Sequence, residues 1–336
     1  MRERISAANA AKLTELTQVK SGWITQVAWS PDGGIVAIAT ADAVRLYVGE
    51  FGGQPAHMLT GHTGHVKGVA FSPNSKMLIS ISADTMIKLW DVSNPKGEVR
   101  EIITLHGHDD SIDSVAFHPD GQRIATASAD GTIIVWRISD YQPIAVLEGH
   151  EKEVSSVTFA LSGNMLVSGS WDTTLRVWDV GAETHGAVLG THEDWVRQVA
   201  VNPPGTVIAS ASKDMSVRLW DAHNGALYGS INAHWQGADC VAFSPDGLVM
   251  ATGGRDNVVR LWDVAQVLQD GSAVPKDAVG TLVGHEKPVL SLTFNPAGTL
   301  LASGGGDNTV RLWSVSDLAE RANPSGIKTS KLPPLE

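Results

Sequence analysis

Three residue types recur at fixed spacing through most of the chain. In six places an Asp stands six positions before a Trp and 22 positions after a His. The sets are His62–Asp84–Trp90, His108–Asp130–Trp136, His150–Asp172–Trp178, His192–Asp214–Trp220, His234–Asp256–Trp262 and His285–Asp307–Trp313. Self-similarity at a fixed spacing is typical of repeat architectures. The interval from each Trp to the next His varies from 14 to 23 residues, so a unit of fixed length alternates with a segment whose length can change.

The fixed unit has the pattern of β-strands. In its first copy, apolar residues alternate over 66–71, a Ser72-Pro73-Asn74 turn follows, and a second strand covers 77–82. The Asp marks a tight turn, a third strand carries the Trp, and a fourth fits before the next His. Period-2 alternation between short turn signals indicates strands and hairpins. We predict a four-stranded antiparallel unit, whose radial repetition would protect the sheet edges.

These residues resemble the WD-repeat (WD40) family. Gly-His pairs stand at 61–62, 107–108, 149–150 and 284–285, and Trp-Asp pairs at 90–91, 178–179, 220–221 and 262–263. Four copies depart from one of the pairs, at Thr191-His192, Ala233-His234, Trp136-Arg137 and Trp313-Ser314, but all keep the His–Asp–Trp spacing. A seventh, degenerate unit precedes the six, with Tyr47 in place of Trp and Ser21-Gly22 in place of Gly-His.

The resemblance implies an all-β fold, a seven-bladed β-propeller of four-stranded antiparallel blades. The last unit ends after its third strand, so we expect the strand-like segment 12–16 to complete the last blade and close the ring. The pattern of Ile5, Asn9, Leu13 and Leu16 resembles bacterial WD-repeat proteins. We therefore expect an N-terminal extension over 1–11, one propeller domain over 12–316 and a disordered C-terminal tail over 317–336.

The resemblance also implies a hydrogen-bonded chain in each full blade, made of the His, a Ser or Thr, the Asp and the Trp. The hydroxyl residue stands four positions before each Asp, at Ser80, Thr126, Ser168, Ser210, Thr252 and Ser303. The indole N–H only donates, whereas a hydroxyl both donates and accepts, so such a chain can satisfy every member. A nucleophilic Ser–His–Asp site is normally single. Six copies therefore indicate a structural role, and we predict no catalytic residue.

In the resembled family, partners commonly bind the propeller face that carries the His loops and Asp turns. The family's contact positions hold Trp171, Trp195, Trp235, Lys213 and Arg255 on the fourth to sixth blades. Glu153 and Glu193 occupy further contact positions, and Trp23 holds the matching place in the first blade. Exposed Trp and Arg are enriched in binding hot spots. The alternative is that the indoles only cover neighbouring blades. We predict a protein or peptide partner with an apolar anchor and mixed charges.

Composition narrows the function further. The formal net charge of −11 argues against sequence-independent nucleic-acid binding. The single cysteine, Cys240, excludes a disulfide framework, and its position favours an inert core residue over a reactive thiol. The N-terminal residues lack the apolar stretch of a secretory signal, and no segment approaches the ~20 apolar residues that span a bilayer. We expect no membrane partner, no metal, no cofactor, a monomeric propeller and a cytoplasmic location, or secretion if the chain is an excised domain.

We predict a non-catalytic interaction scaffold. A propeller enzyme would need an unshared cluster of titratable residues on the channel side, and we expect none outside the repeat positions. Two further functions compete with the scaffold. One is a single-stranded nucleic-acid platform that stacks bases on Trp171, Trp195 and Trp235, and the second is a regulatory or sensor module of a larger bacterial signalling protein. The insert at 264–280 is expected to be a tolerated surface insertion, with a second contact site as the alternative.

Overall fold

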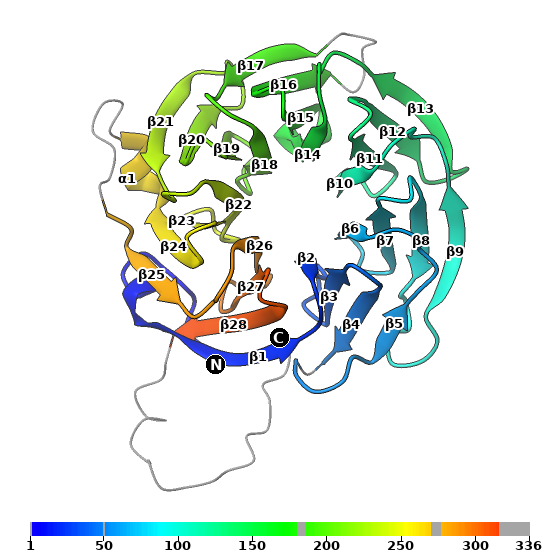
Figure 1. Ribbon diagram of the computed structural model, residues 1–336, viewed down its shortest axis with the longest axis horizontal. Helices are drawn as coiled ribbons and strands as arrows, with labels where there is room; N and C mark the ends of the chain where they lie inside the picture. The colour runs from blue at the N-terminus through cyan, green and yellow to red at the C-terminus, as the bar shows by residue number, and fades with distance from the viewer. Residues whose placement is uncertain (1, 50, 180–185, 270–276, 316–336) are drawn as a thin grey trace, which may run out of the picture.

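Seven four-stranded antiparallel sheets stand around a central channel (Figure 1). The structure is a computed structural model that describes residues 2–49, 51–179, 186–269 and 277–315. Blade 1 is β2-β3-β4-β5, and blades 2 to 6 follow in chain order, four strands each. Blade 7 consists of β26, β27, β28 and β1. The predicted all-β seven-bladed propeller is therefore confirmed.

The strands fall into four concentric sets. The innermost strands are β2 (Ile24–Trp29), β6 (Val66–Phe71), β10 (Ile112–Phe117), β14 (Val154–Ala160), β18 (Val196–Val201), β22 (Ala238–Phe243) and β26 (Val289–Phe294). The second set is β3 (Ile35–Thr40), β7 (Met77–Ser82), β11 (Arg123–Ser128), β15 (Met165–Ser170), β19 (Val207–Ser212), β23 (Val249–Gly254) and β27 (Leu301–Gly305). The third is β4 (Val44–Val48), β8 (Ile87–Asp91), β12 (Ile133–Arg137), β16 (Thr174–Asp179), β20 (Ser216–Asp221), β24 (Val258–Asp263) and β28 (Thr309–Val315). The outer set is β5 (His57–Leu59), β9 (Arg100–Leu105), β13 (Gln142–Leu147), β17 (Ala187–Thr191), β21 (Leu227–Asn232), β25 (Gly280–Val283) and β1 (Leu13–Lys20).

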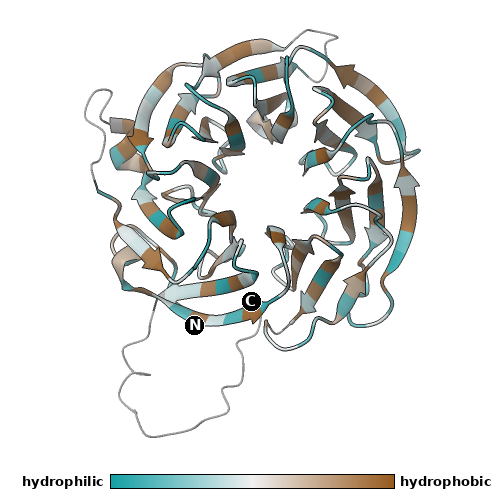
Figure 2. Ribbon diagram, in the orientation of Figure 1, coloured by the Kyte–Doolittle hydropathy of each residue, from teal (hydrophilic) through white to brown (hydrophobic). Residues whose placement is uncertain are grey.

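The hydrophobic core lies between neighbouring blades. Apolar and polar residues alternate along many strands, as Figure 2 shows by colour. Second strands are buried almost throughout, because a blade packs on each of their faces. One cluster joins Ile79 and Ile81 of blade 2 to Ile112 and Trp136 of blade 3. Each blade therefore depends on its neighbours for burial, as expected of a repeat architecture.

The N-terminal strand closes the ring. β1 pairs antiparallel with β28, from Leu13 opposite Val315 to Lys20 opposite Thr309. A side-chain contact between Glu15 and Arg311 adds to this seam. The predicted closure by an N-terminal strand is confirmed, although the strand covers Leu13–Lys20 rather than 12–16.

The residues before this strand also pack on the propeller. The 3-10 helix η1 (Ala10–Lys12) leads into β1. Ile5 is fully buried among residues of blades 6 and 7, and its N–H donates to the carbonyl of Gly298 over 2.8 Å. The N-terminal segment therefore buries apolar surface that an isolated blade pair would expose to water.

The insert between β24 and β25 of blade 6 is partly described. It begins with a short helix, α1 (Val264–Gln269), whose Val264 and Val267 are buried against blade 5 and blade 6. Outside the insert, the short 3-10 segment η2 (Leu161–Gly163) links β14 to β15 in blade 4. Residues 270–276 of the insert and the predicted disordered tail at 317–336 lie outside the described residues.

Candidate functional site

All six full blades contain the same hydrogen-bonded chain. The His Nδ1 lies 2.7–3.0 Å from a carboxylate oxygen of the Asp, and the His Nε2 lies 2.7–2.9 Å from the Ser or Thr hydroxyl. The Trp Nε1 donates to that hydroxyl over 2.8–2.9 Å. Every hydroxyl residue of these chains is fully buried. The chain is satisfied when indole donates to hydroxyl, hydroxyl to imidazole and imidazole to carboxylate, which leaves each His neutral.

These chains place the His loop and the Asp turn side by side. In each of the seven blades, the backbone N–H of the residue before the Asp donates to the carbonyl of the residue three after the His, or its equivalent, over 2.8–3.0 Å. These pairs are 23–41, 65–83, 111–129, 153–171, 195–213, 237–255 and 288–306. The Asp carboxylate also accepts the N–H of the residue after the His in five blades. The variable positions therefore lie together on one face of the ring.

The histidines make stability depend on pH. Burial lowers the pKa of His62, His192 and His285, and this outweighs the opposing effect of their Asp partners. Unfolding frees these groups to take up protons below about pH 6.5, so the free energy of unfolding should fall as pH decreases from 7.5 to 5.5. Each histidine can contribute up to about 1.4 kcal/mol per pH unit in that range. Urea titrations across the range would measure this slope, and a constant stability would contradict the neutral-histidine chain.

Two of the predicted contact residues form one aromatic unit. Trp171 of the blade 4 turn and Trp195 of the blade 5 loop stack with ring centroids 4.1 Å apart and planes 2° from parallel. The Lys213 Nζ lies 4.1 Å from the centroid of the Trp195 ring and 3.2 Å from an oxygen of Asp194. Both indoles are half-buried. They therefore cover each other across the blade boundary and still present surface at the mouth of the channel.

The other predicted contact residues divide into exposed residues outside a hollow at the channel mouth and two residues that line this hollow with the stacked indoles. Trp235 is 67% exposed and Trp23 is 51% exposed, and Glu193 is also exposed. The Arg255 Nε lies 3.4 Å from an oxygen of Asp239. The hollow at the channel mouth brings together Trp171, Trp195, Arg255 and Glu153 with three residues that were not predicted as contact residues, Asp113, Ser155 and Arg197.

A β-bulge aims one side chain of each innermost strand at the channel. In all seven blades the register shifts at the second residue of the innermost strand, which is five residues after the His in blades 2 to 7. A bulge reorients a side chain relative to the regular pleat. The residues at the bulge are Thr25, Lys67, Asp113, Ser155, Arg197, Asp239 and Leu290, all of which line the channel.

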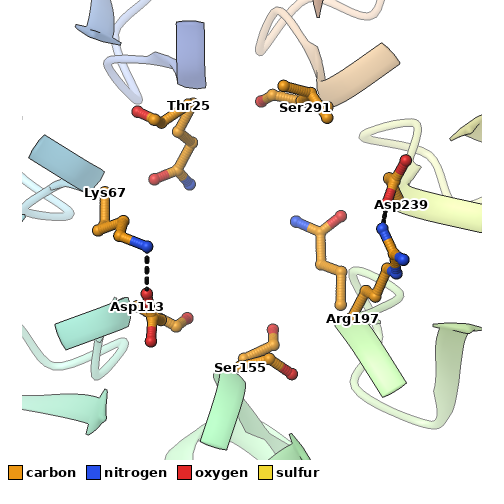
Figure 3. A pocket seen from close by; sticks show the side chains of 12 residues that line it. Thr25, Lys67, Asp113, Ser155, Arg197, Asp239 and Ser291 are labelled. Carbon is orange, nitrogen blue, oxygen red and sulfur yellow. Dashed lines mark hydrogen bonds and ion pairs between the residues drawn. The ribbon is translucent and has the colours of Figure 1, made fainter. Parts of the chain in front are cut away.

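The channel is therefore charged, and the expectation of no titratable cluster there was wrong. Lys67 Nζ lies 3.1 Å from Asp113 Oδ1, and Arg197 contacts Asp239 through Nη1. Figure 3 shows these two ion pairs on opposite sides of the channel. Lys67, Asp113, Arg197 and Asp239 could have been found in the sequence, because each is the fifth residue after a His. Only the bulge explains why their side chains face the channel, since regular strand alternation does not predict it.

Among the residues that line the hollow, Glu153 has a pKa that is raised toward neutral pH. Burial, together with the nearby negative charge of Asp113, raises the pKa of Glu153 to about 7 against the opposing effect of Lys67. Ser155, beside it, does not have the position of an activated nucleophile, because its hydroxyl donates to the carbonyl of Val196 over 2.6 Å. No histidine lines the hollow among the described residues.

The position after the bulge joins the blades. Ser114, Ser156 and Ser291 each accept a backbone N–H of the next blade through Oγ, and Gln26 and Gln198 do so through Oε1, over 2.7–3.1 Å. Cys240 occupies this position in blade 6, where it is fully buried and its Sγ lies 3.5 Å from the carbonyl of Val289. Burial raises the pKa of this thiol well above its usual value, so it stays protonated at neutral pH.

No group of three or more His, Cys, Asp or Glu side chains is placed to hold a metal ion within the described ranges. None of the helices in the described part of the chain has the length and apolar character needed to cross a membrane.

Comparison with known proteins finds repeat-level similarity. The family described as "WD domain, G-beta repeat" matches residues 53–91, 99–137, 141–179, 184–221, 225–263 and 276–314. A Periodic tryptophan protein 2 homolog of Schizosaccharomyces pombe is 48% identical over 52 residues, which are 16% of this chain and 6% of that protein. Topless-related protein 2 of Arabidopsis thaliana is 34% identical over 77 residues, 22% of this chain and 7% of that protein.

A third relative is of more similar length. Eukaryotic translation initiation factor 3 subunit I of Phaeosphaeria nodorum is 49% identical over 39 residues, 12% of each chain. The matches to Periodic tryptophan protein 2 and its homologs cover at most 8% of those proteins. All of these relatives are eukaryotic, so they give no support to the expected bacterial type.

Proposed function

This chain belongs to the WD40 repeat family, and we propose that it is a non-catalytic scaffold that binds a protein or peptide partner on the face formed by the His loops and Asp turns. The supporting observation is the Trp171–Trp195 stack, which lies at the mouth of the channel and lines a hollow there. The repeat does not require Trp at either position, since other blades hold Ala, Ser or Gly. Aromatic residues that keep partial exposure in a hollow are typical anchors for a partner.

We propose that the contact surface comprises the stacked indoles, their charged neighbours and the more exposed residues of the same face. The charged neighbours are Glu153, Lys213 and Arg255, and the exposed residues are Trp23, Glu193 and Trp235. We infer a monomeric propeller, since β1 closes the ring within one chain. We also infer a cytoplasmic site of action, because the buried thiol of the single cysteine needs no oxidising compartment.

The charged channel favours recognition over catalysis. Its ionic side chains are paired with each other, Lys67 with Asp113 and Arg197 with Asp239, and the hydroxyl of Ser155 is engaged by backbone carbonyls. A nucleophile needs a base within hydrogen-bond reach. Glu153 lines the hollow with a pKa raised to about 7, and we infer that its carboxyl group senses the charge of a bound partner.

Affinity purification from the native organism tests the proposal. A Trp171→Ala/Trp195→Ala double variant should lose the partners that the wild type retains, because removing a hot-spot anchor costs about 2 kcal/mol or more, roughly a 30-fold loss of affinity. Leu248→Ala is the matched control. Leu248 is 61% exposed and lies at the other end of β23 from the Asp256 turn, on the opposite face. Equal recovery of all partners by the double variant and the wild type would refute the proposed face.

A further inference from the structure

The hollow at the channel mouth has opposite charges on its two sides. Toward blades 3 and 4, two carboxylates, Asp113 and Glu153, share one nearby cation, Lys67. Toward blades 5 and 6, two guanidinium groups, Arg197 and Arg255, share one carboxylate, Asp239. The first side therefore has one negative charge in excess when Glu153 is ionised, and the second has one positive charge in excess. The Lys67–Asp113 pair of the first side and the Arg197–Asp239 pair of the second face each other across the channel in Figure 3.

The acidic side has one cation, Lys67, for two carboxyl groups. Lys67 Nζ is 3.1 Å from Asp113 Oδ1, whereas Asp113 Oδ2 is buried and accepts no hydrogen bond from an N–H or hydroxyl group of the described residues, so its available donor is the protonated carboxyl of Glu153. Glu153 compensates by holding a proton, since burial and the charge of Asp113 raise its pKa to about 7. A cationic group at this position would take the place of that proton.

The basic side has free donors. The Arg255 Nε lies 3.4 Å from Asp239 Oδ2 in an ion pair without a hydrogen bond, and the backbone N–H of Arg255 donates to the carbonyl of Gly237. The Nη atoms of Arg255 donate to no other described residue. Its side chain is 47% exposed. A guanidinium with two free terminal nitrogens is suited to a carboxylate, which it can bind in bidentate geometry. Arg197 is more buried and is held by Asp239, so it adds positive charge behind Arg255.

We propose that the hollow binds a peptide segment carrying a basic and an acidic side chain next to each other, with the basic group toward Asp113 and Glu153 and the acidic group toward Arg255. The alkyl parts of the two side chains would lie along the Trp171–Trp195 stack. A purely basic segment would be repelled by the arginines, and a purely acidic one by the carboxylates. This inference rests on the proposed function and specifies the partner's charges.

Binding of such a segment releases a proton. The charged groups that face Glu153 are Lys67 on β6, Asp110 and Asp113 at β10, and, across the hollow, Arg197 and Arg255. A bound cation favours the ionised form of Glu153. The affinity should therefore rise by up to about ten-fold between pH 6 and pH 8, the range over which a carboxyl with a pKa near 7 changes from mostly protonated to mostly ionised.

The test uses four capped Ala-based peptides that contain adjacent Arg-Glu, Arg-Gln, citrulline-Glu or citrulline-Gln. Dissociation constants are measured from the indole N–H signals of Trp171 and Trp195 in nuclear magnetic resonance spectra, at pH 6 and pH 8. We expect the Arg-Glu peptide to bind at least about ten-fold more tightly than the citrulline-Gln peptide, the gain expected of charge-assisted hydrogen bonds. Glu153→Gln should remove the gain in affinity that the peptide's Arg provides, and it should abolish the pH dependence of the dissociation constant. Arg255→Gln should remove only the gain due to Glu.

Glu151→Gln is the matched control, because Glu151 is exposed, lies two residues from Glu153 and does not line the hollow. It should leave all four affinities and their pH dependence unchanged. No saturable binding of any peptide, or a charge preference that neither Glu153→Gln nor Arg255→Gln alters, would overturn the inference. The Trp171→Ala/Trp195→Ala variant separates the two proposals. If the peptide experiment fails but this variant still loses native partners, the proposed binding face is supported and only the assignment of the partner's charges is wrong.

Discussion

A chain that lacks residues 2–20 is expected to lose cooperative folding near neutral pH. The deletion removes β1, which pairs with β28 from Leu13 to Lys20, and with it the buried side chains of Ile5, Leu13 and Val19. Each such side chain contributes about 1.5–3 kcal/mol of burial free energy. Their sum is comparable with the whole stability of a typical domain, about 5–15 kcal/mol. The truncated chain would also expose β28 as a sheet edge open to aggregation.

Urea denaturation followed by circular dichroism measures this effect. A synthetic peptide of residues 2–20 added in trans should restore part of the cooperative transition. The reason is that β1 is held to β28 by hydrogen bonds, so it can pair with β28 without being covalently joined to the rest of the chain. A truncated chain that unfolds at the same urea concentration as the wild type would show that β1 does not hold the ring closed.

The second large effect is expected at a single buried indole. Trp136 is 2% exposed and lies in the cluster between blades 2 and 3, with its Nε1 2.9 Å from Thr126 Oγ1. Trp136→Ala should lower the free energy of unfolding by about 3–5 kcal/mol, through lost burial and the cavity left behind. Trp136→Phe keeps most of the ring but removes the donor to a buried hydroxyl, which should cost about 1–3 kcal/mol.

Trp23→Ala is the control for this pair, since Trp23 is 51% exposed and outside the hydrogen-bonded chains. An exposed substitution of this kind should change stability by no more than about 0.5 kcal/mol. Equal decreases in the free energy of unfolding for Trp136→Ala and Trp23→Ala would mean that the Trp of the repeated His–Asp–Trp set has no special structural role.

The blades could be predicted because their determinants are local. His, Ser or Thr, Asp and Trp of one chain all lie within one 29-residue stretch, as from His62 to Trp90, so their spacing reports a single unit. Closure by β1 was also predictable, because the last unit lacked a strand and a strand-like segment stood at the other end. The burial of Ile5 was not foreseen, since it depends on contacts with blades 6 and 7, far away in the sequence.

The charged channel could not be seen in the same way. The segment Val66-Lys67-Gly68 is compatible with plain alternation, and nothing in it marks a bulge. Lys67 and Asp113 come from different blades, as do Trp171 and Trp195, so their contacts follow from the spacing between neighbouring sheets. The sequence could identify the variable positions of this face, but only the assembled ring shows which of them meet.

Hydrogen–deuterium exchange on the complex with a purified native partner tests the central claim most directly. We expect partner-dependent protection in the loops and turns around Glu153, Trp171, Trp195 and Arg255, and no change in the turn at 245–248 on the opposite face. Protection confined to the opposite face or to the outer strands, with these loops unaffected, would contradict the claim that the channel mouth is where this propeller binds its partner.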